Sequence, residues 1–287
     1  MENHVNRLLT LNHLFPKFNR METGLYLYCV REKCNETIEV LKTMSGDEKV
    51  QILPFLDLEA IISEVSIEEF NSEEIRKKAE EDLDWIKVKA QIHEEVIEQA
   101  MRSGGSTIIP VIPMQFGVIF KTREKLQETL YNNLEKFRKS LEYLAGRQEW
   151  GIKAYLDQKV FEVFLEKGNE ELLAKKREAE ALPKGLSFFA KKKVASTIED
   201  IKEKELDKII NEIYERLAES GISLHKAKIL EKDFTLMDEE MILNGFYLIE
   251  ESRLNEFRGK TEEFRDKFNH CGIKIEMSGP WPSYHFI

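Results

Sequence analysis

The sequence predicts an α+β protein, because short apolar strands and long amphipathic helices are interspersed along its 287 residues. Apolar residues make up 42% of the chain and aromatic residues 10%. That composition can fill two cores, in line with a prior of roughly 150 residues per domain. We expect the chain to divide as follows: an N-terminal extension over 1–20, an N-terminal α+β domain over 21–146, a C-terminal domain over 147–278 and a C-terminal tail over 279–287.

The N-terminal domain is expected to open with a central strand. Residues 24–30, GLYLYCV, are apolar on both alternating faces, which is typical of a strand covered on both sides. Pro110 and Pro113 cannot donate to a sheet ladder, so their segment is expected at an edge or a bend. The other elements expected in this half are strands at 50–56 and 58–65, a helical stretch over 67–102, two short strands or a strand and a buried loop within 107–120, and a helix over 123–145.

The sequence pattern of the C-terminal domain predicts strands and helices in the order β-α-β-β-α-β, which is that of a ferredoxin-like fold. Its first strand, 149–157, places Trp150, Ile152, Ala154 and Leu156 on one face. The other elements expected here are helical regions over 158–181 and 186–219, strands at 222–230 and 240–250, a helix that carries Leu254, Phe257, Phe264 and Phe268, and a strand at 273–277. We place the boundary between the two domains near Gly146.

Charge and cysteine content exclude several classes of protein. The net charge of −10 argues against a nucleic-acid binder and against an anionic membrane surface as the partner. The longest nearly apolar run, 108–120, is shorter than the roughly 20 residues that span a bilayer. The three cysteines are an odd number, which indicates reduced thiols in a cytoplasmic protein. Residues 1–20 are expected to be disordered, with a basic partner-binding arm as the alternative.

Motifs of catalysis and metal binding are missing from the sequence. It contains no phosphate loop, no GxGxxG, no GxSxG and no HExxH. Cys29 and Cys34 have no second pair at the spacing of a zinc site. We interpret His93, on the apolar stripe of its helix, as a hydrogen-bonded core residue. The alternative is a ligand-binding or enzymatic module with a site near His93 and neighbouring carboxylates.

Two other clusters have a structural interpretation. His270 beside Cys271 is interpreted as a helix end, because neighbours in sequence do not face each other on a helix. Lys191, Lys192 and Lys193 follow two phenylalanines, and basic residues beside aromatic ones can bind nucleic acid. In an acidic chain we interpret these lysines as a helix rim and the phenylalanines as buried.

The last nine residues, GPWPSYHFI, form a stiff aromatic tail. Pro280 and Pro282 fix the backbone and exclude a helix, and Trp281 before a proline favours an extended conformation. Trp281, Tyr284 and Phe286 offer large areas for burial. One interpretation is a structural lock that folds back on its own domain. The other is a contact for a partner protein, with the aromatic residues as its anchors.

Six segments in the same order resemble motifs of the gas vesicle protein family GvpL/GvpF. They are GLYLYCV (24–30), DLEAIISEV (57–65), HEEVIEQAM (93–101), VIPMQFGVIF (111–120), GRQEWGIKAYLD (146–157) and GPWPSYHF (279–286). The similarity covers nearly everything from Gly24 to Ile287. Two residues depart from the family pattern: Ser283 stands where the family has a second tail proline, and Gln115 where it commonly has an arginine.

This resemblance implies a non-enzymatic accessory protein that acts in the nucleation or assembly of gas vesicles in the cytoplasm. Its expected partners are the major gas vesicle shell protein and other gas vesicle accessory proteins. No cofactor, nucleic acid or membrane is expected as a partner. The resemblance also implies two α+β domains, one of them ferredoxin-like, in line with the strand order above.

Overall fold

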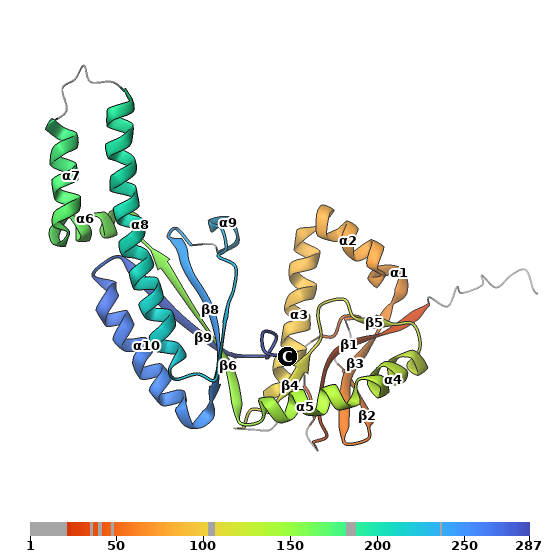
Figure 1. The fold of residues 1–287 in the computed structure, drawn as a ribbon. Helices are drawn as coiled ribbons and strands as arrows, with labels where there is room; N and C mark the ends of the chain where they lie inside the picture. Colours follow the sequence, from red (N-terminus) through yellow and green to blue (C-terminus); the bar gives the residue numbers. More distant parts are fainter. Residues whose placement is uncertain are drawn as a thin grey trace, which may run out of the picture. The chain divides into compact units, whose positions relative to one another are not determined.

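A computed structural model of the chain describes residues 22–34, 37–39, 42–46, 49–102, 107–181, 188–235 and 237–287 (Figure 1). The fold mixes helices and sheets and is of the α+β class. The chain forms two compact units. Unit 1 comprises Met1–Gln99 and Met114–Leu134, and unit 2 comprises Ala100–Pro113 and Glu135–Ile287.

The sheet of unit 1 is built around β1 (Thr23–Glu32), as the apolar pattern predicts. β1 pairs antiparallel with β3 (Leu58–Ser66) and with the short β5 (Ile119–Phe120), and β2 (Gln51–Phe55) pairs with β3. Residues 25–30 of β1 are all buried, so both faces of this central strand are covered. The three strands expected between residues 24 and 65 are therefore confirmed.

The helical stretch expected over 67–102 is interrupted twice. It consists of α1 (Ile67–Phe70), α2 (Ser72–Glu81) and α3 (Leu83–Arg102). Asn71 is extended, and its side chain accepts hydrogen bonds from two backbone N–H groups at the start of α2. Asp82 accepts from the backbone N–H of Trp85 in the same way. Leu83, the first residue of α3, is apolar but 61% exposed.

The helix expected over 123–145 is also divided, into α4 (Arg123–Asn132) and α5 (Leu134–Leu144). Asn133 has non-helical backbone angles between them. Leu126 and Leu130 of α4 are buried, and so are Phe137, Leu141 and Leu144 of α5. Gly146 has a φ of 67°, which suits a residue just past a helix end. β4 (Val111–Pro113) and β5 are the two short strands expected within 107–120.

Unit 2 contains a four-stranded sheet in the order β7-β8-β6-β9, with every neighbouring pair antiparallel. Its strands are β6 (Arg147–Leu156), β7 (Ser223–Lys226), β8 (Glu240–Glu250) and β9 (Ile273–Trp281). β7 is shorter than expected, because its regular pairing with β8 ends at Lys226. β9 is longer than expected and includes the first three residues of the predicted tail.

The helices that follow β6 in unit 2 are α6 (Gln158–Gly168), α7 (Glu170–Ala181), α8 (Phe188–Ala218), α9 (Lys232–Thr235) and α10 (Leu254–Asn269), with a 3₁₀ turn at Glu251–Arg253. α8 and α10 cover one face of the sheet, and α7 lies beside the first half of α8 (Figure 1). The core beneath them contains the predicted strand face of Trp150, Ile152, Ala154 and Leu156. Phe257, Phe264 and Phe268 of α10 pack against it.

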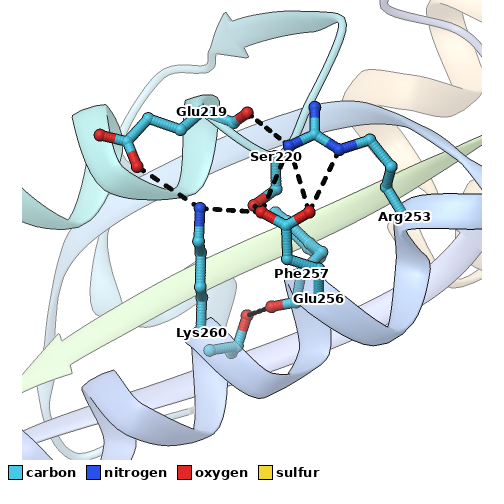
Figure 2. A network of polar contacts seen from close by, with 7 residues as sticks. Glu219, Ser220, Arg253, Glu256, Phe257 and Lys260 are labelled. Atoms are coloured by element: carbon cyan, nitrogen blue, oxygen red, sulfur yellow. Dashed lines mark hydrogen bonds and ion pairs between the residues drawn. The ribbon is translucent and has the colours of Figure 1, made fainter.

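A network of polar contacts joins the end of α8 to the start of α10 (Figure 2). The carboxylate of Glu256 accepts hydrogen bonds from Arg253 at 3.2 Å and from the Ser220 hydroxyl at 2.9 Å. The Lys260 ammonium lies 3.1 Å from the same carboxylate and 3.4 Å from that of Glu219. Arg253 also donates to the backbone oxygen of Glu219 at 2.8 Å, which holds the two helix ends together.

Candidate functional site

The C-terminal tail begins as part of the sheet of unit 2. Trp281 is the last residue of β9 and stands opposite Glu149 on β6. Its indole N–H donates to the Ser278 hydroxyl at 3.0 Å. The pairing is irregular between Glu149 and Gly151, where the partner residues on β9 step from Trp281 to Ser278. The tail therefore leaves the sheet at a defined place.

Gly151 makes room for this arrangement. A Cβ atom on Gly151 would lie 3.1 Å from the Ser278 hydroxyl oxygen, 3.4 Å from the Phe246 ring and 3.4 Å from the Trp281 indole nitrogen. Gly151 follows Trp150, whose side chain is in the core, so these groups meet on the opposite face of the sheet. The glycine inside β6 thus marks a close approach of the tail to that face.

A buried carboxylate holds the end of the tail. Glu149 is 1% exposed and accepts two hydrogen bonds from His285, one from the ring Nδ1–H at 2.6 Å and one from the backbone N–H at 3.2 Å. The His285 ring stacks on Phe246 of β8, with the ring centroids 3.8 Å apart and the planes 15° from parallel. His225 of β7 contributes a second ring, 4.8 Å from that of His285.

The five predicted tail residues lie along this path. Pro280 and Trp281 are half-buried and line a small cavity of unit 2 together with Ile109 and Leu144. Pro282 is buried, and Tyr284 and Phe286 are half-buried. Ser283, at the position of the family's second proline, is also buried. The tail is therefore bonded to the sheet of its own unit at Trp281 and at His285, whereas the final residue, Ile287, is 42% exposed.

Four residues of this site were not singled out from the sequence: Glu149, Gly151, Phe246 and His285. Only Gly151 carried a usable signal, since a glycine inside a strand often marks a close approach of another segment. Glu149 and His285 are 136 positions apart, and neither stands out in its local pattern. Their pairing appears only once β6 and β9 are placed side by side.

His93, the centre of the alternative site, lies 2% exposed on α3 within unit 1. Its Nε2 is 3.0 Å from the backbone oxygen of Met114, and its Nδ1 is 3.0 Å from the Tyr26 hydroxyl. A carbonyl can only accept, so Nε2 carries the hydrogen, and in the neutral ring Nδ1 accepts from Tyr26. Tyr26 in turn accepts from the backbone N–H of Gly117 at 3.0 Å.

These hydrogen bonds indicate a structural role for His93. Burial lowers the pKa of His93 to about 4, although the bond to Met114 acts in the opposite direction. The ring is therefore neutral at physiological pH and bridges α3, β1 and the segment 114–117. An effective general base has a pKa near the working pH, so a pKa of about 4 does not suit His93 to that role. The cavities of about 250 and 340 Å³ lie in unit 2, and His93 lines neither.

The two buried cysteines, Cys29 and Cys271, are in environments that disfavour a reactive thiolate. Burial raises the pKa of Cys29 to about 12 and also raises that of Cys271, so both are protonated thiols at neutral pH. The argument that His270 and Cys271 do not face each other was wrong, because the Cys271 sulfur lies 3.5 Å from His270 Nε2. Among the described residues, no three or more His, Cys, Asp or Glu side chains are grouped to hold a metal ion.

The lysine cluster lies at the start of α8. Lys192 and Lys193 are exposed, which agrees with a helix rim. The side chains of Phe188, Phe189 and Lys191 lie outside the described residues, as do residues 1–20 and 103–106. No helix within the described ranges combines the length and the apolar character needed to cross a membrane.

Comparisons with known proteins agree with the motif resemblance. The family model described as gas vesicle synthesis protein GvpL/GvpF matches residues 24–287. Gas vesicle protein L of a Streptomyces species is 25% identical over 264 residues, which cover 91% of each chain. Gas vesicle protein F of Haloferax mediterranei is 21% identical, over 93% of this chain and 94% of its own.

Solved structures show the same fold. The crystal structure of the gas vesicle protein GvpF from Anabaena sp. PCC7120 superimposes with a TM-score of 0.72 at 21% identity, over 92% of this chain and 98% of that one. GvpF from Microcystis aeruginosa gives a TM-score of 0.62 over the same shares. With a family match that spans both units and ends at the last tail residue, this chain belongs to the GvpL/GvpF family of gas vesicle synthesis proteins.

Proposed function

We propose that this chain is an accessory protein of gas vesicle formation, which acts during nucleation or assembly through contacts with other proteins and without turning over a substrate. Its partners are the major gas vesicle shell protein and other gas vesicle accessory proteins, and its place is the cytoplasm and the growing vesicle. The observation that carries this proposal is the family match over 24–287. Relatives named gas vesicle proteins L and F, similar over more than nine-tenths of the chain, support it further.

The geometry supports contact over catalysis. His93 is neutral, buried and hydrogen-bonded on both ring nitrogens, and the buried thiols Cys29 and Cys271 are protonated. The part of the chain most unusual for a protein terminus, the aromatic tail, is fixed to the face of a sheet. In our proposal the tail is a structural lock of unit 2, and it keeps the binding surfaces of this unit in shape.

We also propose that the C-terminal half is a ferredoxin-like domain with its first helical connection enlarged. Two observations support this assignment. Along the chain, the elements follow the order β6, helices, β7, β8, α10, β9, and in the sheet the antiparallel strands follow the order β7-β8-β6-β9. α6, α7 and α8 together take the place of the single first helix. The division of the chain into domains near Gly146 stays a prediction, since the compact units assign 100–113 to unit 2.

The test is removal of the tail. A chain truncated before Trp281 is expressed beside the full chain in gas-vesicle-forming cells that lack the native gene. Pull-downs then measure capture of the major shell protein and of the other accessory proteins. We expect the truncated chain to be less stable and to support few or no vesicles, because the outer face of the sheet loses its cover. A stable truncated chain that captures its partners and supports normal vesicles would refute the lock.

A separate arm tests the function itself. Cells that lack the chain entirely are examined for vesicles by electron microscopy. Normal vesicles in these cells would remove the accessory role, whatever the result of the truncation. Release of a product from any small molecule by the purified full chain would instead favour the enzymatic alternative.

A further inference from the structure

A second feature of unit 2 lies away from the tail, at the other end of β6 and β8. A cavity of about 250 Å³ opens between these strand ends, α6 and α8. Its apolar wall consists of Leu156, Phe161, Leu206 and Ile242, of which Leu156 and Phe161 are buried in the core. Sites for whole small molecules usually have volumes of ~300–1,000 Å³, so this cavity is better matched to a single extended side chain.

The remaining wall of the cavity is strongly acidic. It carries four carboxylates, Glu162, Glu199, Glu203 and Glu240, and one ammonium, Lys202. Lys202 is already engaged, since it pairs with both Glu162 and Glu199. Glu199 and Glu203 are one turn apart on α8 and therefore lie on the same side of the helix.

Glu203 and Glu240 have a different environment. Glu240 accepts a hydrogen bond from the Gln158 amide at 2.7 Å, a neutral donor that leaves its negative charge uncompensated. Within the described residues no ion pair is recorded for Glu203 or Glu240, and both side chains are exposed. The cavity thus combines an apolar wall with an excess of negative charge at its mouth.

We propose that this cavity is a docking site for a lysine or arginine side chain of a partner protein, presented on a basic segment. Such a side chain has an apolar stem and a cationic end, and it buries the stem on apolar surface while its charge stays near water or a carboxylate. The stem would pack on Leu206 and Ile242, and the cation would be attracted by Glu203 and Glu240. This inference rests on the proposed function and adds the chemistry of the partner: it is basic at the contact.

The direct test is a titration with a minimal probe, read by methyl NMR of the full-length protein. The probe is Nα-acetyl-lysine methylamide, and its counterpart is Nα-acetyl-norleucine methylamide, which has the same stem without the ammonium. We expect saturable shifts of the Leu206 and Ile242 methyl signals with the lysine probe, weakened by added salt. The double variant Glu203→Gln/Glu240→Gln should lose affinity by roughly tenfold or more, about 1.4 kcal/mol.

A matched control is Glu215→Gln, which removes an exposed carboxylate of the same helix outside the cavity. It should bind the probe like the unaltered chain, and thermal melting should show both variants folded. Three results would overturn the proposal: no saturable shift, equal binding of the norleucine probe, or full affinity in the double variant.

A pull-down connects the cavity to vesicle formation. Capture of at least one gas vesicle partner should fall in the double variant and should be sensitive to salt in the unaltered chain. Unchanged capture at all salt concentrations would refute a role of the cavity in docking, yet would leave the accessory function intact. Normal vesicles in cells without the chain would refute the accessory function, while the probe titration would still decide on the cavity.

Discussion

At the scale of single residues, burial determines the hydrogen bonding of the polar groups around His93 in unit 1. His93, Tyr26 and Tyr28 lie together, and the Tyr28 ring stacks near the imidazole at 5.9 Å between centroids. Tyr28 accepts from the backbone N–H of Met44 at 2.9 Å and bonds the Ser63 hydroxyl at 2.8 Å. A set of hydrogen bonds satisfied in this way specifies one packing of the core, because any slip would leave a buried polar group without a partner.

The pH dependence of stability tests this view of His93. Its folded pKa of about 4 lies below the ordinary value of 6.5, so the unfolded chain binds the proton first as the pH falls. Stability is therefore lost between pH 6.5 and pH 4, by roughly 3 kcal/mol for this group. His93→Gln should be less stable than the unaltered chain at neutral pH and should lose less stability across this window.

Hydrogen-exchange pulse labelling along a urea gradient can measure the stability of unit 1 in peptides from β1 and α3. The free energy of unfolding is compared between the two ends of the pH window for each protein. Equal losses in His93→Gln and the unaltered chain would show that the imidazole is not the group kept neutral by burial.

Gly151 gives a second prediction at the residue scale. Gly151→Val places two methyl groups against Ser278, Phe246 and Trp281, and overpacking of this kind costs about 1–3 kcal/mol. We expect lower thermal stability and faster hydrogen exchange in the tail peptide 279–287. Gly259→Val is the matched control, because a Cβ at Gly259 meets nothing within 4 Å. Comparable losses of thermal stability from the two substitutions would contradict close packing of the tail against Gly151.

At the scale of elements, the junction of α8 and α10 depends on one carboxylate. Glu256 is held by Lys260, by Ser220 and by Arg253, and these contacts lower its pKa to about 2. Glu256 also stands in the first turn of α10, where a negative charge is favoured by the helix dipole. The network of Figure 2 therefore joins two helices that are far apart in sequence.

We predict that Glu256→Gln lowers the stability of unit 2 at neutral pH. Because the folded pKa of about 2 lies below the ordinary value of 4.5, the stabilisation is fully present above about pH 4.5 and is lost as the pH falls toward 2. The difference in melting temperature between variant and unaltered chain should shrink over the same window. Glu263→Gln, at an exposed position of the same helix, should have little effect. A difference that stays constant below pH 4.5 would exclude the charge of Glu256 as its cause.

The elements also show what the sequence could and could not predict. A continuous apolar run correctly predicted β1, and alternation of apolar residues predicted the core face of β6, because a strand must be apolar wherever it is covered. Helix breaks at Asn71, Asp82 and Asn169 were missed, since each lies inside a charged helical run. Their signal was present: Asn or Asp directly before a helix start is a good cap.

The candidate site was only partly predictable for a related reason. The aromatic residues of the tail stand out in the sequence, but the residues that receive them lie on β6 and β8. The carboxylate of Glu149 resembles any other charged residue of a chain in which 33% of residues are charged. Its role in binding the tail depends on the register of β6 with β9, which brings residue 149 opposite residue 281.

At the scale of the whole molecule, two features of unit 2 have different expected roles. In our proposals the tail is a structural lock on the sheet, whereas the acidic cavity binds a basic side chain of a partner. If the tail is a lock, vesicle formation should follow the stability of unit 2 and should not depend on the exposed end of the tail. His285 and Ile287, two positions apart, allow these possibilities to be separated, because His285 is fixed by Glu149 and Phe246 while Ile287 is 42% exposed.

We predict that His285→Ala destabilises unit 2, since it removes the ring bond to Glu149 and the stacking on Phe246 and leaves a buried carboxylate with one partner fewer. The loss should be about 1–3 kcal/mol, and vesicle number should fall with it. Ile287→Ser should change stability by less than about 0.5 kcal/mol and leave vesicles normal, as expected for an exposed side chain. Thermal unfolding and electron microscopy measure both. A stable Ile287→Ser chain that fails to form vesicles would instead make the exposed end of the tail a partner contact.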